Sequence, residues 1–88
     1  MDLKRRYADM KAQAGDALLL FPVGDFYELF FDDATVAAKT LGITLTIRDK
    51  GTANPTPMAG FPHQVLDGHL RRLLEAGHRV AVCEIVKA

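Results

Sequence analysis

The sequence has 88 residues, which is enough for one small domain and too few for a multidomain machine. Hydrophobic residues make up 49% and charged residues 25%, a balance typical of a folded globular protein rather than a disordered one. Eleven basic residues offset eleven acidic ones, and this net charge of zero argues against a strongly basic domain that holds nucleic acid by charge alone.

The first part of the chain predicts a helix followed by two strands. Apolar residues recur with helical spacing over residues 3–14, and Gly15 follows where such a helix would end. The apolar run over residues 17–21 predicts a buried strand. Residues 22–25, Pro-Val-Gly-Asp, have the composition of a turn, and the aromatic-rich residues 26–31 favour a second strand.

A second helix is predicted after the aromatic segment. Asp32 or Asp33 would cap its N-terminus, its alanines share one face, and Gly42 marks its C-terminal end. The alternation of apolar and polar residues over 43–48 then predicts a half-exposed strand. Residues 49–57 have the composition of a loop.

The C-terminal part predicts one strongly amphipathic helix and a last strand. Met58, within Pro-Met-Ala-Gly, is interpreted as a packing residue in a tight loop. A helix is expected after Pro62, ending at Gly77, with one apolar stripe formed by Leu66, Leu70, Leu73 and Leu74. Residues 79–86 predict a further buried strand. We therefore expect a single small α/β domain, with a mixed β-sheet flanked by about three helices.

Residues 24–31, Gly-Asp-Phe-Tyr-Glu-Leu-Phe-Phe, have an unusual composition for a strand. Strand geometry places Phe26, Glu28 and Phe30 on one face. One interpretation is an ordinary central strand with Glu28 at the sheet edge. The other is that Phe26 projects as an apolar wedge, of the kind that unstacks DNA bases from the minor groove. Phosphates would repel Glu28, so the carboxylate would need a displaced base as its hydrogen-bonding partner.

Other chemistries have weaker support. The chain has no serine, which excludes a Ser–His–Asp hydrolase. No spacing for a metal site is seen among the three histidines, His63, His69 and His78. A Mg²⁺-dependent nuclease cluster is conceivable from four carboxylates, Asp25, Glu28, Asp32 and Asp33. Helix capping explains Asp32 and Asp33 better, so we expect neither a metal site nor a catalytic residue.

The sequence also favours a cytoplasmic location. Its one cysteine, Cys83, cannot form an intrachain disulfide, which fits a reducing compartment. The basic residues near the N-terminus are not followed by an apolar segment, so no secretory signal is expected. No apolar stretch approaches the 18 residues typical of a membrane span, and no membrane partner is expected.

Several motifs occur together in a specific order over about residues 3–84. They are Val-Gly-Asp-Phe-Tyr-Glu-Leu-Phe at 23–30, Asp33-Ala34, Leu45-Thr46 with Arg48, Pro-Met-Ala-Gly at 57–60 with Pro62, Ala76-Gly77, and Arg-Val-Ala-Val-Cys-Glu at 79–84. In this combination the sequence resembles the N-terminal mismatch-recognition domain, domain I, of the MutS family of DNA mismatch repair proteins.

The resemblance implies a role for four residues. Phe26 and Glu28 match the family's Phe-x-Glu pair, in which the Phe stacks on a mispaired or unpaired base from the minor groove and the Glu hydrogen-bonds to that base. Arg48 matches a family Arg near the DNA backbone, and Lys50 is a second candidate for the same role. The implied function is non-enzymatic recognition of mismatched double-stranded DNA, together with other MutS-type domains or a MutS dimer.

The sequence departs from the family's pattern at three places. Pro22-Val23 stands where the family often has Arg-Met, and Ile85 follows Cys83-Glu84 where the family has Gln. Gln64 and His69 stand where His and Tyr are expected. Pro22-Val23 directly precedes the segment that contains Phe26. Ile85 bears on how the chain joins the next domain, and Gln64 and His69 bear on packing or DNA contacts.

The chain, residues 1–88, is expected to lack the family's last strands and all of its downstream domains. It contains no Gly-x-x-x-x-Gly-Lys-Ser/Thr loop, so we expect no cofactor here and assign ATP and Mg²⁺ to those downstream domains. Two alternatives stay open. One is a shortened MutS-like module that binds a protein and not DNA, and the other is the metal-dependent nuclease.

Overall fold

The computed structural model describes residues 3–83, which form five strands, three α-helices and one short 3₁₀ helix. In chain order the elements are α1 (Leu3–Ala14), β1 (Leu18–Val23), β2 (Phe26–Phe30), α2 (Phe31–Leu41), β3 (Thr46–Arg48), β4 (Thr56–Pro62), η1 (His63–Val65), α3 (Leu66–Glu75) and β5 (Val80–Val82). The predicted α/β class with a mixed sheet and three helices is confirmed.

The strands form one sheet in the order β3-β4-β2-β1-β5. β1 and β5 run parallel, and every other neighbouring pair is antiparallel. Gly24 and Asp25 connect β1 to β2 as a two-residue hairpin loop, with Gly24 at a φ of 59°. A positive φ at the first loop residue suits the right-handed twist of the two strands, which is why glycine stands there.

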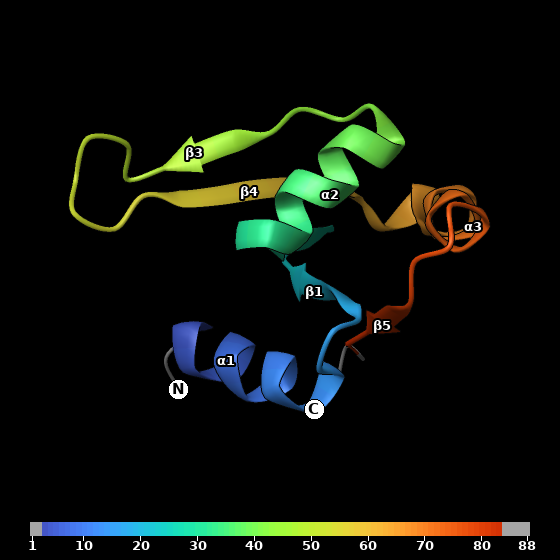
Figure 1. Cartoon of the computed structure of the whole chain (residues 1–88), viewed down its shortest axis with the longest axis horizontal. Coiled ribbons are helices and arrows are strands. Elements are labelled where there is room, and N and C mark those ends of the chain that lie inside the picture. The colour runs from blue at the N-terminus through green and yellow to red at the C-terminus, as the bar shows by residue number, and fades with distance from the viewer. Residues whose placement is uncertain (1–2, 84–88) are drawn as a thin grey trace.

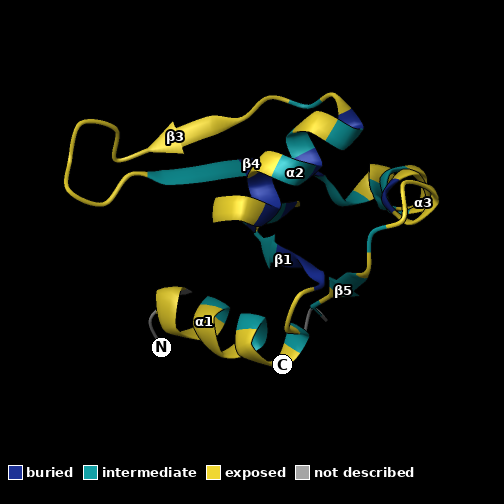
Figure 2. Cartoon of the chain, in the orientation of Figure 1, coloured by how far each residue is buried: buried dark blue, intermediate teal, exposed yellow. Residues whose placement is uncertain are grey.

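Helices cover both faces of the sheet (Figure 1). α2 lies across β2 and β4, and its alanines Ala34 and Ala37 are fully buried against Leu29 of β2. Leu73 of α3 joins the same core, so α2 and α3 share one face. α1 lies on the opposite face, against β1, and is exposed along most of its outer surface (Figure 2).

The β3–β4 hairpin projects away from the helices, and Figure 2 shows that β3 and the connecting loop are exposed. β4 corrects two predictions, because residues 56 and 57 belong to a strand rather than a loop and Met58 lies within that strand rather than in a tight loop. β4 contains two prolines and a glycine, which are rare in strands, so its sequence does not predict a strand. Pairing of residues 58–62 with β2 and of residues 56–58 with β3 outweighs these local preferences.

The junction between β2 and α2 also differs from the prediction. Phe31 is the first residue of α2 rather than the last of the strand, and it adopts a φ of 57°. Neither Asp32 nor Asp33 caps the helix; the N-cap position is Phe30, which makes no side-chain capping bond. The carboxylate of Asp33 instead accepts hydrogen bonds from the Leu19 N–H and the Lys11 ammonium.

Smaller differences concern the ends of elements. β1 continues through Pro22 and Val23, where a turn was predicted, and β3 contains only Thr46–Arg48. Leu74 is 53% exposed, so it does not belong to the buried stripe of α3. The predicted last strand is present as β5, but it lies at the edge of the sheet and is not buried, with Val82 39% exposed. Its predicted continuation to residue 86 lies outside the described residues.

Candidate nucleic-acid interface

Phe26 begins β2 directly after the Gly24–Asp25 loop, and the residue is 42% exposed. Its neighbours Tyr27 and Leu29 are buried in the core, because alternate residues of a strand point to opposite faces. The ring of Phe26 therefore lies at the surface, at one end of a strand whose other face is fixed by packing. A buried ring would have favoured the ordinary core strand.

His63, the first residue after β4, contacts the backbone of Asp25 and Phe26. Its Nε2 lies 3.1 Å from the carbonyl oxygen of Phe26, and its backbone N–H donates to the Asp25 carbonyl at 3.0 Å. A carbonyl can only accept, so Nε2 must carry the proton in this contact. Sequence reasoning missed His63, because the contact spans 37 residues and depends on the unrecognised strand β4.

Glu28 lies on the same face as Phe26, two residues further along β2. It is paired with Phe21 of β1 on one side and with Gly60 of β4 on the other. Partial burial raises the pKa of its carboxyl above the usual value, and the positive charge of Arg48 acts in the opposite direction. Glu28 is therefore a half-buried carboxyl group beside an exposed aromatic ring.

Arg48 and Lys50 have different positions relative to this pair. Arg48 ends β3 opposite Thr56 of β4, and the alternation along β4 places it on the same face as Glu28. Lys50 lies in the exposed loop that follows β3, outside the sheet. The structure brings Phe26, Glu28 and Arg48 onto one face and leaves Lys50 beyond its edge.

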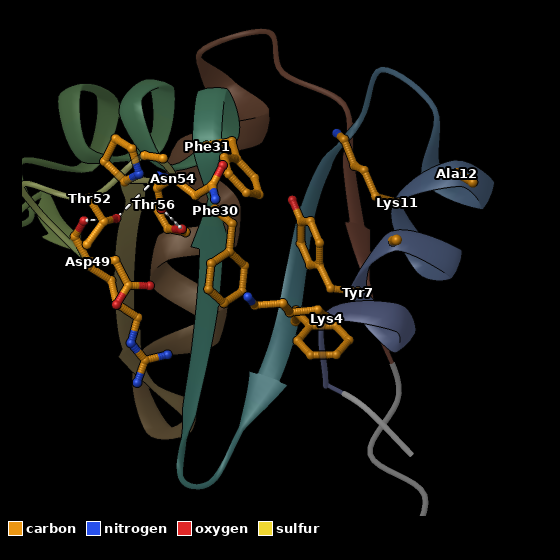
Figure 3. Close-up of a pocket in the computed structure, with 15 residues that line it drawn as sticks. Lys4, Tyr7, Lys11, Ala12, Phe30, Phe31, Asp49, Thr52, Asn54 and Thr56 are labelled. Atoms are coloured by element: carbon orange, nitrogen blue, oxygen red, sulfur yellow. Dashed lines mark hydrogen bonds between the residues drawn. The ribbon is translucent and has the colours of Figure 1, made fainter.

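A groove of about 1140 Å³ lies on the same face, between α1 and the loop that joins β3 to β4. Figure 3 shows Lys4 and Tyr7 extending from α1 toward Phe30 at the end of β2. The Tyr7 and Phe30 rings meet edge to face, with their centroids 4.9 Å apart. Arg48 also lines the groove, which therefore continues the Phe26–Glu28 surface toward α1.

The other candidate residues do not converge. Within residues 3–83, no group of three or more His, Cys, Asp or Glu side chains is arranged to hold a metal ion. The histidines are separated: His63 contacts Phe26, His69 packs against Phe61, and His78 lies 3.3 Å from the Thr40 hydroxyl. None of the helices described has the length and hydropathy to cross a bilayer.

Comparison with known proteins identifies the family to which this sequence is similar. A family model described as MutS domain I matches residues 2–88. The DNA mismatch repair protein MutS of Rhodopirellula baltica is 60% identical over 85 residues, which are 97% of this chain and 10% of that protein. The protein of the same name from Salinibacter ruber is 53% identical over 97% of the chain and 9% of its own length.

A third relative, the DNA mismatch repair protein MutS of Sorangium cellulosum, is 51% identical over 91% of the chain and 9% of its own length. The chain thus spans about a tenth of the length of the relatives it matches. The motifs that carry the resemblance lie within the matched residues, and the predicted relationship is confirmed. The chain belongs to the MutS domain I family of DNA mismatch repair proteins.

Proposed function

We propose that this chain recognises mispaired or unpaired bases in duplex DNA, with Phe26 as the stacking wedge and Glu28 as the hydrogen-bonding partner of the displaced base. The observation that carries the proposal is the pairing of an exposed aromatic ring with a half-buried carboxyl group on one sheet face. An apolar ring inserted from the minor groove unstacks a base step, most easily where the duplex is already weakened by a mismatch.

Arg48 supports the proposal as a backbone contact. It is exposed at the end of β3 on the same face, and its guanidinium would offset the repulsion between Glu28 and the phosphates. Lys50 has a smaller role in this proposal, because it lies in the loop beyond the sheet. Phosphate contacts position a protein on DNA, whereas the wedge and its carboxyl partner distinguish mispaired from paired sites.

The chain would act as the non-catalytic DNA-contacting part of a longer cytoplasmic protein. In this proposal other MutS-type domains or a MutS dimer supply most of the affinity, and ATP and Mg²⁺ serve those domains. The relatives support this division, because the chain corresponds to only 9–10% of each.

The test is to place this chain in full-length MutS of Rhodopirellula baltica, in place of the matching segment, and measure affinity for G·T-mismatched and paired duplexes with Mg²⁺ present. Phe26→Ala should remove the preference for the mismatch, because base–aromatic stacking contributes about 1–3 kcal/mol, or roughly five- to 150-fold in affinity. Leu74→Ala is the control, since it removes an apolar side chain that is 53% exposed on α3, on the opposite face of the sheet, and it should leave the preference unchanged.

An unchanged mismatch preference in the Phe26→Ala protein would show that the wedge assignment is wrong. If the intact chimera itself showed no preference, a protein-binding module would become the better description. Strand cleavage that disappears without Mg²⁺ and persists in the absence of ATP would instead favour the nuclease.

A further inference from the structure

Gly60 lies in the interior of β4, directly opposite Glu28 of β2. A Cβ atom placed on Gly60 would overlap the Oε1, Oε2 and Cδ atoms of Glu28, which together make up its carboxyl group. The Glu28 carboxyl therefore fills the space that the side chain of any other residue at position 60 would need.

The backbone of Gly60 gives no other reason for a glycine. A positive φ, which other residues adopt only with strain, occurs at five glycines of the described chain: Gly15, Gly24, Gly42, Gly51 and Gly77. Gly60 is not among them, so its φ angle does not require glycine. Glycine inside a strand weakens it and commonly marks a close approach. At Gly60 the approaching group is the carboxyl of Glu28.

The other side of Glu28 is closed by Phe21 of β1, its partner across the hairpin. Phe21 is fully buried, and its ring meets the Tyr7 ring edge to face at 5.7 Å. A Glu28 side chain that leaned toward β1 would displace this packed aromatic pair. Glu28 therefore leans across β4, where the missing side chain of Gly60 leaves room.

The overlap also fixes the height of the carboxyl group above the sheet. A Cβ atom stands one bond above the backbone, so a group in its place lies close to the sheet surface. The carboxyl therefore lies low beside the exposed ring of Phe26 instead of extending outward to where DNA phosphates would repel it. Such a position suits a contact with a base that the ring has displaced.

We propose that Gly60 is a specificity-determining residue, which positions the Glu28 carboxyl beside Phe26 by leaving the space over β4 empty. This inference rests on the proposed function and deepens it. An alanine at position 60 would move the flexible end of Glu28 rather than the backbone, because the three atoms nearest to the added Cβ all belong to the carboxyl group. The substitution should thus change recognition while the fold is retained.

The experiment compares Gly60→Ala with Glu28→Ala and with Gly68→Ala, a control in α3 where an added Cβ meets nothing within 4 Å. The Glu28 carboxyl is titrated by NMR in the 88-residue chain, and mismatch preference is measured in the full-length chimera. Gly60→Ala should lower the pKa of Glu28 toward its usual value as the carboxyl moves into water. It should reduce mismatch preference about three- to tenfold, the effect of one lost hydrogen bond.

Each result decides the question. The inference is wrong if Gly60→Ala leaves the Glu28 titration and the mismatch preference as they are in the parent, or if Gly68→Ala has the same effects. Loss of preference in Glu28→Ala but not in Gly60→Ala overturns the inference and leaves the proposed function standing. No loss in Glu28→Ala overturns the role proposed for the carboxyl, and with it the inference.

A folding defect in Gly60→Ala is also informative. The double variant Glu28→Ala/Gly60→Ala removes the carboxyl that stands in the way, so it should fold as the parent does. If the double variant stays unfolded, glycine is required by the backbone of β4 and the inference fails.

Discussion

Tyr7 connects α1 to the aromatic side chains on the sheet face that carries Phe26 and Glu28. Its ring meets Phe21 and Phe30 edge to face, with centroids 5.7 and 4.9 Å apart. Burial, and to a smaller extent the negative charge of Asp33, raises the pKa of Tyr7 to about 12. The neutral phenol is therefore favoured in the folded state, because ionisation would place a negative charge among rings and near a carboxylate.

The raised pKa predicts a loss of stability in strong base. The unfolded chain releases the Tyr7 proton near pH 10 and the folded chain near pH 12, so the folded state holds more protons between these values. Stability from this residue is fully present below pH 10 and is lost as the pH rises through 12. The full shift would correspond to about 2.7 kcal/mol, and water around the half-buried ring reduces our expectation to about 1 kcal/mol.

Urea unfolding of the parent and of Tyr7→Phe, measured from pH 9 to 12, isolates this effect. The lysines titrate in both proteins, so the difference between the two curves reports on the phenol alone. The free energy of unfolding of Tyr7→Phe should fall less steeply than that of the parent. Parallel curves would show that Tyr7 ionises equally easily in the folded and unfolded chains.

At the scale of elements, one polar cluster attaches α1 to the rest of the fold. The Lys11 ammonium donates to the Ala17 carbonyl at 2.7 Å and to the Asp33 carboxylate at 2.9 Å. The same carboxylate oxygen accepts the Leu19 N–H at 3.1 Å, so helix α1, strand β1 and helix α2 meet at one atom. The Asp33 side chain is only 10% exposed, so its charge depends on these partners.

Asp33→Ala should destabilise the chain by about 2–3 kcal/mol, because it leaves the buried Leu19 N–H without an acceptor and removes the negative charge that neutralises the partly buried Lys11 ammonium. The matched control is Asp16→Ala. Asp16 also forms an ion pair, 3.0 Å from Arg79, but its side chain is 79% exposed, and its loss should cost about 0.5 kcal/mol or less. Urea unfolding at neutral pH measures both. Equal losses would mean that burial does not determine the strength of the Asp33 contacts.

The sequence predicted the elements whose signals are local. Helix α1 begins and ends where periodicity and Gly15 place it, and Gly42 ends α2 in the left-handed conformation. Strand β4 was not predicted, because its stability comes from pairing with β2 and β3 rather than from its own residues. Asp33 was misread for a similar reason, since its partners Lys11 and Leu19 lie 22 and 14 residues away.

In the candidate site too, features with local sequence signals could be predicted, and features that depend on contacts between distant residues could not. The alternation of one strand predicts that Phe26 and Glu28 share a face, and the role proposed for them comes from the family resemblance. The exposure of Phe26 and the lateral position of Glu28 depend on neighbouring strands. Gly60 and His63 enter the site only through the register of β4, which nothing in the local sequence reveals.

At the scale of the whole molecule, the zero net charge limits how the chain meets DNA. Residues 1–44 have a net charge of −2 and residues 45–88 a net charge of +2, so the excess of cations begins with the hairpin that carries Arg48 and Lys50. That hairpin projects from the body of the fold (Figure 1). It could therefore contact a duplex while residues 1–44, which have the net negative charge, stay further away. In the proposed function, a neutral chain with a few projecting cations would sense a local defect, and other MutS-type domains would supply most of the affinity.

The isolated 88-residue chain should therefore bind a perfectly paired duplex weakly, with a Kd above about 1 µM at physiological salt. Each phosphate contact releases counterions and contributes about −0.9 to the slope of log affinity against log salt concentration. Two contacts, from Arg48 and Lys50 of the β3–β4 hairpin, predict a slope of about −2, and Arg48→Gln should make it shallower by about 1. Fluorescence anisotropy between about 50 and 200 mM salt measures both quantities. Submicromolar binding to paired DNA, or a slope unchanged by Arg48→Gln, would contradict this account, because the affinity would then come from cations elsewhere on the chain.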